Sequence, residues 1–130
     1  MIEIPTDLPA DLVPLSWLVG VWEGTGVIDY EVDGRSFSGE FAHRVSFSHD
    51  GGAFLNYFAD AWLLEGEERR PLVSEIGYWR LARPVGDADA GPGLLPATAA
   101  PVTRTADDVE ALRNADGGFD IEVSLAHADG

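Results

Sequence analysis

The sequence has no cysteine, and its 130 residues include only 8 basic side chains against 23 acidic ones. The absence of cysteine excludes disulfides, thiolate metal sites and cysteine nucleophiles. The formal net charge of −15 opposes contact with a phosphate backbone, so we expect no nucleic-acid partner. The excess of acidic residues is more typical of a solubilising surface than of an acidic recognition site.

Long hydrophobic runs are also missing. No apolar stretch approaches the length that spans a bilayer, and residues 1–13 are acidic where a secretory signal is basic and then apolar. We therefore expect a cytoplasmic protein with no membrane partner. A chain of 130 residues has room for a single domain, residues 1–130, with one modest core.

Residues 14–26, PLSWLVGVWEGTG, are the stretch around which the rest of the chain can be arranged. Apolar residues between positions 12 and 19 have the spacing of a short helical turn, which we expect to cover one end of a sheet. From Trp22 onward, alternate positions predict a strand with Gly24 and Gly26 on one face. Glycines at these positions permit strong curvature, or the close approach of a backbone or a ligand.

Further strands follow through short turns. Residues 37–49 alternate most cleanly between apolar and polar, which indicates a half-buried antiparallel strand. Asp33-Gly34 and Asp50-Gly51-Gly52 are turn signals on either side of it. Residues 54–64 and 72–82 predict a third and a fourth strand, with residues 65–70 as a charged turn between them. Both faces of the third strand are partly apolar, so its orientation stays open.

The last third of the chain is less regular. Residues 84–116 are mostly aperiodic and predict an irregular insertion at the rim of the sheet. Within it, Thr105 has the position of an N-cap for a short helix through Leu112, with a frayed loop as the alternative. Residues 119–125 predict a fifth strand. Five strands are too few to close a barrel, which needs about eight, so we expect open edges, completion by a second copy, or the N-terminal part of a longer domain. We favour the last.

A set of motifs resembles one known family. Gly20, Trp22, Gly24 and Gly26 form the GXWXGXG motif. Further matches follow in order, at FSHDG (47–51), AFLNY (53–57), PL (71–72), Glu75, GYWR (77–80) and LAH (125–127). Together they resemble the nitrobindin family of fatty-acid-binding-protein-like haem β-barrels, and in particular a divergent ferric branch of it. The insertion at 84–116 has no counterpart in the family pattern.

The resemblance implies an all-β, antiparallel, lipocalin-like meander barrel, incomplete in this chain, with a short N-terminal helical turn and haem b in a surface cleft. It implies peroxynitrite-isomerase chemistry at ferric haem, where the iron provides the reactive position and the protein provides the ligand and the cleft. The axial histidine would lie beyond Gly130. The glycines and tryptophan of the motif would be structural or line the cleft.

The chain also departs from the family pattern at two places. Residues 27–32, VIDYEV, replace a Tyr-Pro-Thr-Ile stretch that contributes a pocket threonine, and Val73 stands where members often carry a histidine. These departures leave the haem pocket only partly represented in the sequence.

The three histidines are weak candidates for iron ligands. His43 and His49 share a strand face but are separated by about 20 Å at the usual strand rise, too far to bind one ion together. Hydrogen-bonded structural roles are more frequent for such side chains, and the same holds for His127. No nucleophile elbow surrounds a serine and no P-loop is present, so we assign no catalytic residue.

Two functions of different classes stay open. One is a haem protein with peroxynitrite-isomerase activity. The other is a non-catalytic barrel that binds an apolar ligand such as a fatty acid, with a barrel that binds nothing as its limiting case. Exposed strand edges also predict a homodimer formed by strand pairing.

Overall fold

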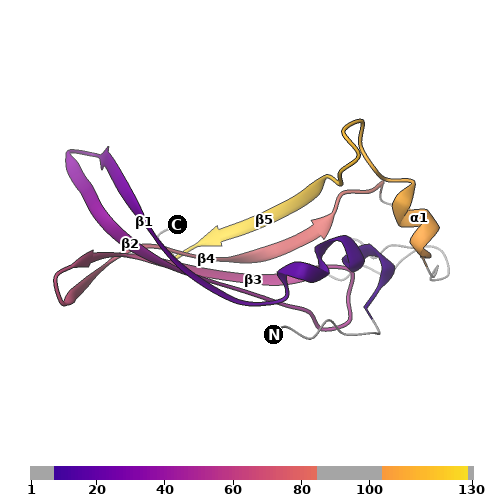
Figure 1. Ribbon diagram of the computed structural model, residues 1–130, viewed down its shortest axis with the longest axis horizontal. Coiled ribbons are helices and arrows are strands. Elements are labelled where there is room, and N and C mark those ends of the chain that lie inside the picture. Colours follow the sequence, from indigo (N-terminus) through magenta and orange to yellow (C-terminus); the bar gives the residue numbers. More distant parts are fainter. Residues whose placement is uncertain (1–7, 85–103, 129–130) are drawn as a thin grey trace.

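The computed structural model describes residues 8–84 and 104–128, and Figure 1 shows their arrangement. The helices and strands, in chain order, are η1 (Ala10–Leu18), β1 (Gly20–Val32), β2 (Arg35–Ser48), β3 (Leu55–Glu65), β4 (Glu68–Leu81), α1 (Ala106–Glu110) and β5 (Ile121–His127). The predicted helical turn, the five strands and the short helix capped by Thr105 are therefore all present. The aperiodic part of the predicted insertion, residues 85–103, lies outside the described residues.

The strands form one five-stranded antiparallel sheet in the order β1-β2-β3-β4-β5. This is the predicted meander, and within the described residues β1 and β5 are its open edges. The β1–β2 hairpin turns through Asp33 and Gly34, whose φ angles of 51° and 75° match the two-residue turn expected there. The sequence prediction of an all-β, unclosed sheet with little helix is confirmed.

The predicted charged turn at residues 65–70 was wrong in extent. Only Gly66 and Glu67 form the turn, because β3 runs to Glu65 and β4 already begins at Glu68. The two arginines of this stretch lie over aromatic rings, with Arg69 4.9 Å from the ring centre of Trp62 and Arg70 4.2 Å from that of Phe37. Cation–π contacts of this kind suit paired strands better than an open loop.

One face of the sheet, which we call the inner face, carries the core. On β3 it contains Leu55, Tyr57, Ala59, Ala61 and Leu63, all of them buried. Leu12 and Leu15 of η1 pack against this face together with Phe47 of β2. The burial settles the orientation of β3 that the sequence left open. In Figure 1 the strands bow, and η1 lies on their concave side near one end.

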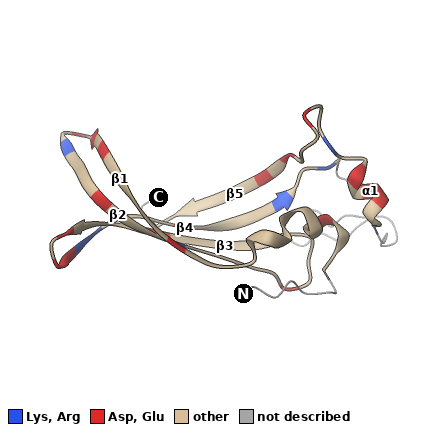
Figure 2. Ribbon diagram, viewed as in Figure 1, with Lys and Arg blue, Asp and Glu red and all other residues tan. Residues whose placement is uncertain are grey.

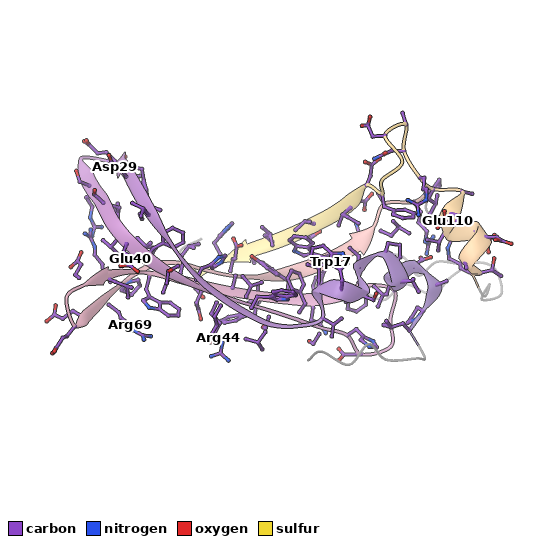
Figure 3. All side chains as sticks on the ribbon, viewed as in Figure 1. Trp17, Asp29, Glu40, Arg44, Arg69 and Glu110 are labelled. Carbon is purple, nitrogen blue, oxygen red and sulfur yellow. The ribbon has the colours of Figure 1, made fainter. Side chains whose placement is uncertain are left out.

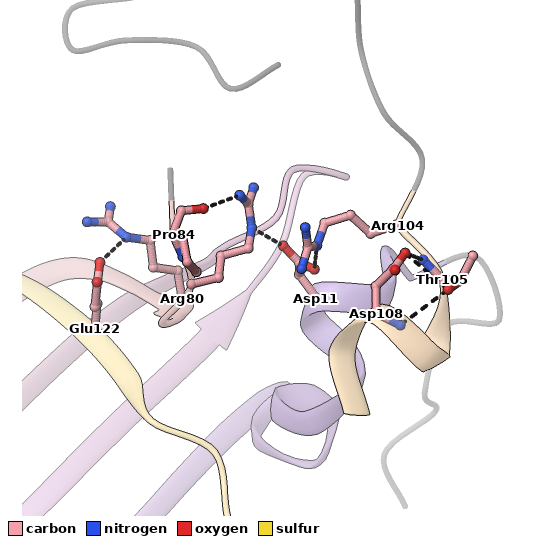
Figure 4. Close-up of polar contacts among 8 residues, drawn as sticks. Asp11, Arg80, Pro84, Arg104, Thr105, Asp108 and Glu122 are labelled. Carbon is pink, nitrogen blue, oxygen red and sulfur yellow. Dashed lines mark hydrogen bonds and ion pairs between the residues drawn. The ribbon is translucent and has the colours of Figure 1, made fainter. Parts of the chain in front are cut away.

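A buried carboxylate ties η1 to the rest of the molecule. Asp11 accepts hydrogen bonds from Nε of Arg83 at 2.8 Å and from Nε of Arg104 at 2.7 Å (Figure 4). Arg83 follows β4 and Arg104 precedes α1, so a single side chain joins three elements. Next to it, Thr105 and Asp108 form a capping box at the start of α1, which ends at Glu110, two residues before the predicted end.

Candidate ligand-binding face

Beyond η1, the inner face keeps apolar side chains exposed. Trp22, Val73, Val123 and Leu125 retain 37–45% of their surface, although register places them on the same face as the core. Trp17 of η1 meets the ring of Trp22 edge-on, with the ring centres 6.4 Å apart. Figure 3 shows Trp17 on one side of the sheet and Arg44 and Arg69 on the other. Exposed apolar surface in a concave setting is typical of a ligand-binding face.

The GXWXGXG motif lies at the start of β1, and three of its residues serve the fold. Gly20 has a φ of 134°, which side chains rarely permit. Trp22 donates from Nε1 to the carbonyl oxygen of Leu18 at 2.7 Å, so it ties η1 to β1. A side chain at Gly26 would collide with the ring of Phe41, which covers that position.

Gly24 is the motif residue that leaves space on the inner face. A Cβ built there would have no atom within 4 Å. Its cross-strand neighbour is His43, and the next residue along the same row is Ala61 on β3. Small residues on both sides therefore leave room around the imidazole of His43. Of the predicted motif residues, Gly24 is the one whose surroundings suit a cleft-lining role.

A polar cluster of Tyr57, Glu75 and His127 crosses β3, β4 and β5 on the inner face. The Tyr57 hydroxyl donates to Oε1 of Glu75 at 2.5 Å, and Nε2 of His127 lies 2.8 Å from the second carboxylate oxygen, Oε2. The pKa of Tyr57 is raised well above its usual value, chiefly by burial and further by the hydrogen bond to Glu75 and its charge. Tyr57 therefore stays protonated and continues to donate at neutral pH.

The three histidines are not brought together. His43 lies within β2, whereas His49 follows the end of β2 and accepts the backbone N–H of Gly51 at Nδ1, 3.2 Å away. His127 lies at the end of β5 against Glu75. Among the residues that the structure describes, no group of three His, Cys, Asp or Glu side chains could hold a metal ion.

Sequence reasoning missed Glu75 and Tyr57 as a site. A signal for Glu75 was present, because it alternates with the inner-face residues Val73, Gly77, Trp79 and Leu81 and is the only charged residue among them. A charge on an otherwise apolar strand face marks a functional candidate. Tyr57 could not be linked to it without the β3–β4 register, in which Tyr57 lies opposite Gly77.

Two open hollows lie on the opposite, outer face. One, of about 580 Å³, is lined by Asp60, Trp62, Arg69 and Ser74, and the other, of about 390 Å³, by Asn56, Ile76, Tyr78 and Ser124, among others. Neither hollow is lined by a histidine, so neither offers an imidazole ligand for iron. Charged residues are frequent at the two hairpin tips and on α1, and others lie along β4 and β5 (Figure 2). In the described part of the chain, no helix has the length and apolar character needed to cross a membrane.

Comparison with known proteins gives a consistent result. The model of the THAP4-like, heme-binding beta-barrel domain matches residues 11–130. The chain is 58% identical to a peroxynitrite isomerase of Clavibacter michiganensis subsp. michiganensis and 57% identical to one of Leifsonia xyli subsp. xyli, over all of this chain and 65% of each relative. It is 53% identical to the peroxynitrite isomerase of Arthrobacter sp. (strain FB24), over 99% of this chain and 63% of that protein. The chain thus spans about two thirds of the length of these relatives.

Proposed function

Because this chain belongs to the nitrobindin family of THAP4-like, haem-binding β-barrel domains, we propose that its inner face is a wall of a haem b pocket and that the protein isomerises peroxynitrite. The observation that carries the proposal is the family match along residues 11–130. The proposed activity is that of the relatives in Clavibacter michiganensis subsp. michiganensis and Leifsonia xyli subsp. xyli, which are peroxynitrite isomerases longer than this chain.

The residues of the inner face fit a porphyrin. Trp22, Val73, Val123 and Leu125 offer exposed apolar surface for its flat faces, and the space at Gly24 lets a ligand approach the sheet closely. Bound ferric haem would supply the metal centre at which peroxynitrite rearranges to nitrate. The residues of this chain would hold the porphyrin and exclude water. The axial histidine beyond Gly130 stays a prediction from the family resemblance.

The second candidate function is the binding of an apolar ligand such as a fatty acid, without catalysis. Val73 favours it, because this exposed inner-face position holds an aliphatic side chain where family members often carry a histidine. The same apolar wall suits an acyl chain as well as a porphyrin. The two functions differ in whether an imidazole is needed.

Several finer features belong to the same proposal. A closed, lipocalin-like barrel would need further strands to pair with β1 and β5, the two edges of the described sheet. The single domain over residues 1–130, the cytoplasmic location and a homodimer through these edges are predictions of the sequence that we retain. The open edges support strand pairing of some kind, because unpaired backbone groups there are free to bond to another strand.

The test is an optical titration of the chain with ferric haem, followed by the Soret band. We expect saturable binding, and we expect Val73→Glu to weaken it about tenfold, because a charge would enter the apolar wall at a cost of about 1.4 kcal/mol. Ile76→Glu is the matched control, since Ile76 lies on the same strand, is exposed at 55%, and faces the outer side.

Three outcomes separate the candidates. Equal haem binding by both glutamate variants would contradict the proposed location. A chain that takes up a fluorescent fatty acid but no haem, with uptake unchanged in His43→Gln and His127→Gln, would favour the apolar-ligand function. A chain that binds neither would leave the inner face without a ligand.

A further inference from the structure

The Tyr57–Glu75–His127 cluster has the form of a site rather than of a surface ion pair. Its carboxylate is largely buried, with the Glu75 side chain 18% exposed, while the His127 side chain remains 47% exposed. The row of cross-strand neighbours to which it belongs runs Trp22, Val45, Ala59, Glu75 and His127. From the Ala61–Val73 pair to the Leu81–Ile121 pair, Glu75 is the only inner-face strand residue with a carboxylate, and none is an arginine.

Tyr57 fixes one side of the carboxylate. Its ring is held between Phe47 and Trp79, with ring centres 5.2 Å and 5.5 Å away, so the hydroxyl has one direction in which to point. The small side chain of Ala59, opposite Glu75, leaves that path open. Because the hydroxyl donates to Oε1, the second oxygen of Glu75 is left to accept a hydrogen from His127.

The contact with Glu75 decides which imidazole nitrogen of His127 carries the hydrogen. When Nε2 donates to Glu75, the neutral ring carries its lone pair on Nδ1, since only one nitrogen holds a hydrogen. The main chain next to it is anchored as well, because Ala128 donates its N–H to the carbonyl oxygen of Ser74 at 3.0 Å. A carboxylate that orients an imidazole and supports its positive charge is the arrangement that makes histidine an efficient base.

We propose that His127 is a proton acceptor for an acidic O–H group of a ligand on the inner face, and that Glu75 and Tyr57 are the positioning residues that prepare it. The inference rests on the proposed function, whose substrate in its protonated form, peroxynitrous acid, carries such a group. The proton passes from the oxygen of the acid to Nδ1 of His127. The products of this step are the peroxynitrite anion and an imidazolium, whose charge the carboxylate of Glu75 balances.

His49 differs from His127 in how its ring nitrogen is used. In His49, Nδ1 already accepts the N–H of Gly51, so its acceptor nitrogen is used by the turn. Its substitution by glutamine therefore serves as a control for the loss of a histidine outside the inner face.

The first arm of the test needs no haem. The hydrogen on Nε2 of His127 is expected to exchange slowly enough to give a downfield imidazole resonance in the NMR spectrum of the chain. The resonance should persist in His49→Gln and disappear in His127→Gln and in Glu75→Ala. Its absence from the unsubstituted chain, or its persistence in Glu75→Ala, would overturn the assigned geometry.

The second arm uses the haem-loaded chain and stopped-flow measurement of peroxynitrite decay. His127→Gln should leave haem uptake unchanged but slow the decay about 100-fold, a usual size for the loss of a general base. Added imidazole should restore part of the rate in His127→Gly, which a merely structural role would not permit. Unchanged decay in His127→Gln would overturn the proposal.

Failure of the proposed function would give results that differ from those of a failure of the His127 proposal alone. If the unsubstituted chain took up no haem, peroxynitrite isomerisation and the role of His127 in it would both fall. The NMR resonance would still decide, independently of haem, whether Glu75 holds the imidazole as described.

Discussion

Two carboxylates with little exposed surface each hold several elements together, and they have different partners. Asp11 accepts from two guanidinium groups and its side chain is only 4% exposed. Glu75 accepts from a tyrosine hydroxyl and faces an imidazole that is about half exposed. Both carboxylates join three elements of the fold, so the number of elements that they join does not distinguish them.

The two carboxylates differ in the chemistry of their partners, which are arginines for Asp11 and a tyrosine and a histidine for Glu75. Arginine keeps its charge at every pH at which the protein folds, so the bridge from Asp11 to Arg83 and Arg104 is permanent. The imidazole of His127 is about half exposed and has one nitrogen that can donate and one that can accept a hydrogen, so a ligand on the inner face can reach it. The Asp11 bridge therefore belongs to the fold, whereas the Glu75 cluster can take part in chemistry.

The largest expected effect is on the Asp11 side. Asp11→Asn removes a carboxylate that two partly buried guanidinium groups share and should lower the free energy of unfolding by about 3 kcal/mol. Denaturant midpoints measure this. Glu122→Gln is the matched control, because its pair with Arg80 is about half exposed and should contribute less than about 1 kcal/mol. Similar losses of stability in Asp11→Asn and Glu122→Gln would contradict the structural role of the Asp11 bridge.

A smaller effect is expected where β4 meets β5. In Gly77→Ala the new Cβ would collide with the backbone oxygen of Ser124, so β5 must shift, at a cost of about 2 kcal/mol. The shift would also part His127 from Glu75 and remove the imidazole resonance. In Gly24→Ala the Cβ meets no atom within 4 Å, and stability should be kept. Thermal denaturation of both variants measures the difference in stability, and the NMR spectrum of Gly77→Ala shows whether the imidazole resonance is lost. A Gly77→Ala protein as stable as the unsubstituted chain would contradict the prediction.

The sequence predicted the sheet well because its signals are local. Alternation, the Asp33-Gly34 turn and the Thr105 cap each depend on residues close together in the chain, and each appears in the structure. The sequence underestimates the length of β4, because the charges of Arg69 and Arg70 suit a turn and the aromatic rings that these side chains cover come from other strands.

The site was predicted less well because it depends on register. Tyr57 and His127 meet Glu75 from 18 and 52 residues away, and no local pattern in the sequence connects them. The Asp11 bridge spans 72 and 93 residues and was missed for the same reason. The glycine-rich motif, by contrast, was visible in the sequence, but only the structure separates Gly24, with open space, from Gly26, which the ring of Phe41 covers.

The smallest effect tests whether Tyr57 keeps its proton in the folded chain at alkaline pH. The pKa of Tyr57 in the folded chain lies well above its usual value of 10.0, because burial and Glu75 oppose its ionisation. Above about pH 10 the unfolded chain loses this proton while the folded chain keeps it, so stability is complete below that pH and falls by up to about 1.4 kcal/mol per pH unit above it. Denaturant midpoints between pH 8 and about pH 11 should therefore fall less steeply in Tyr57→Phe. Asp11→Asn should keep the slope of the unsubstituted chain, because it leaves Tyr57 and Glu75 unchanged. Parallel curves for Tyr57→Phe and the unsubstituted chain would contradict the raised pKa of Tyr57 in the folded chain.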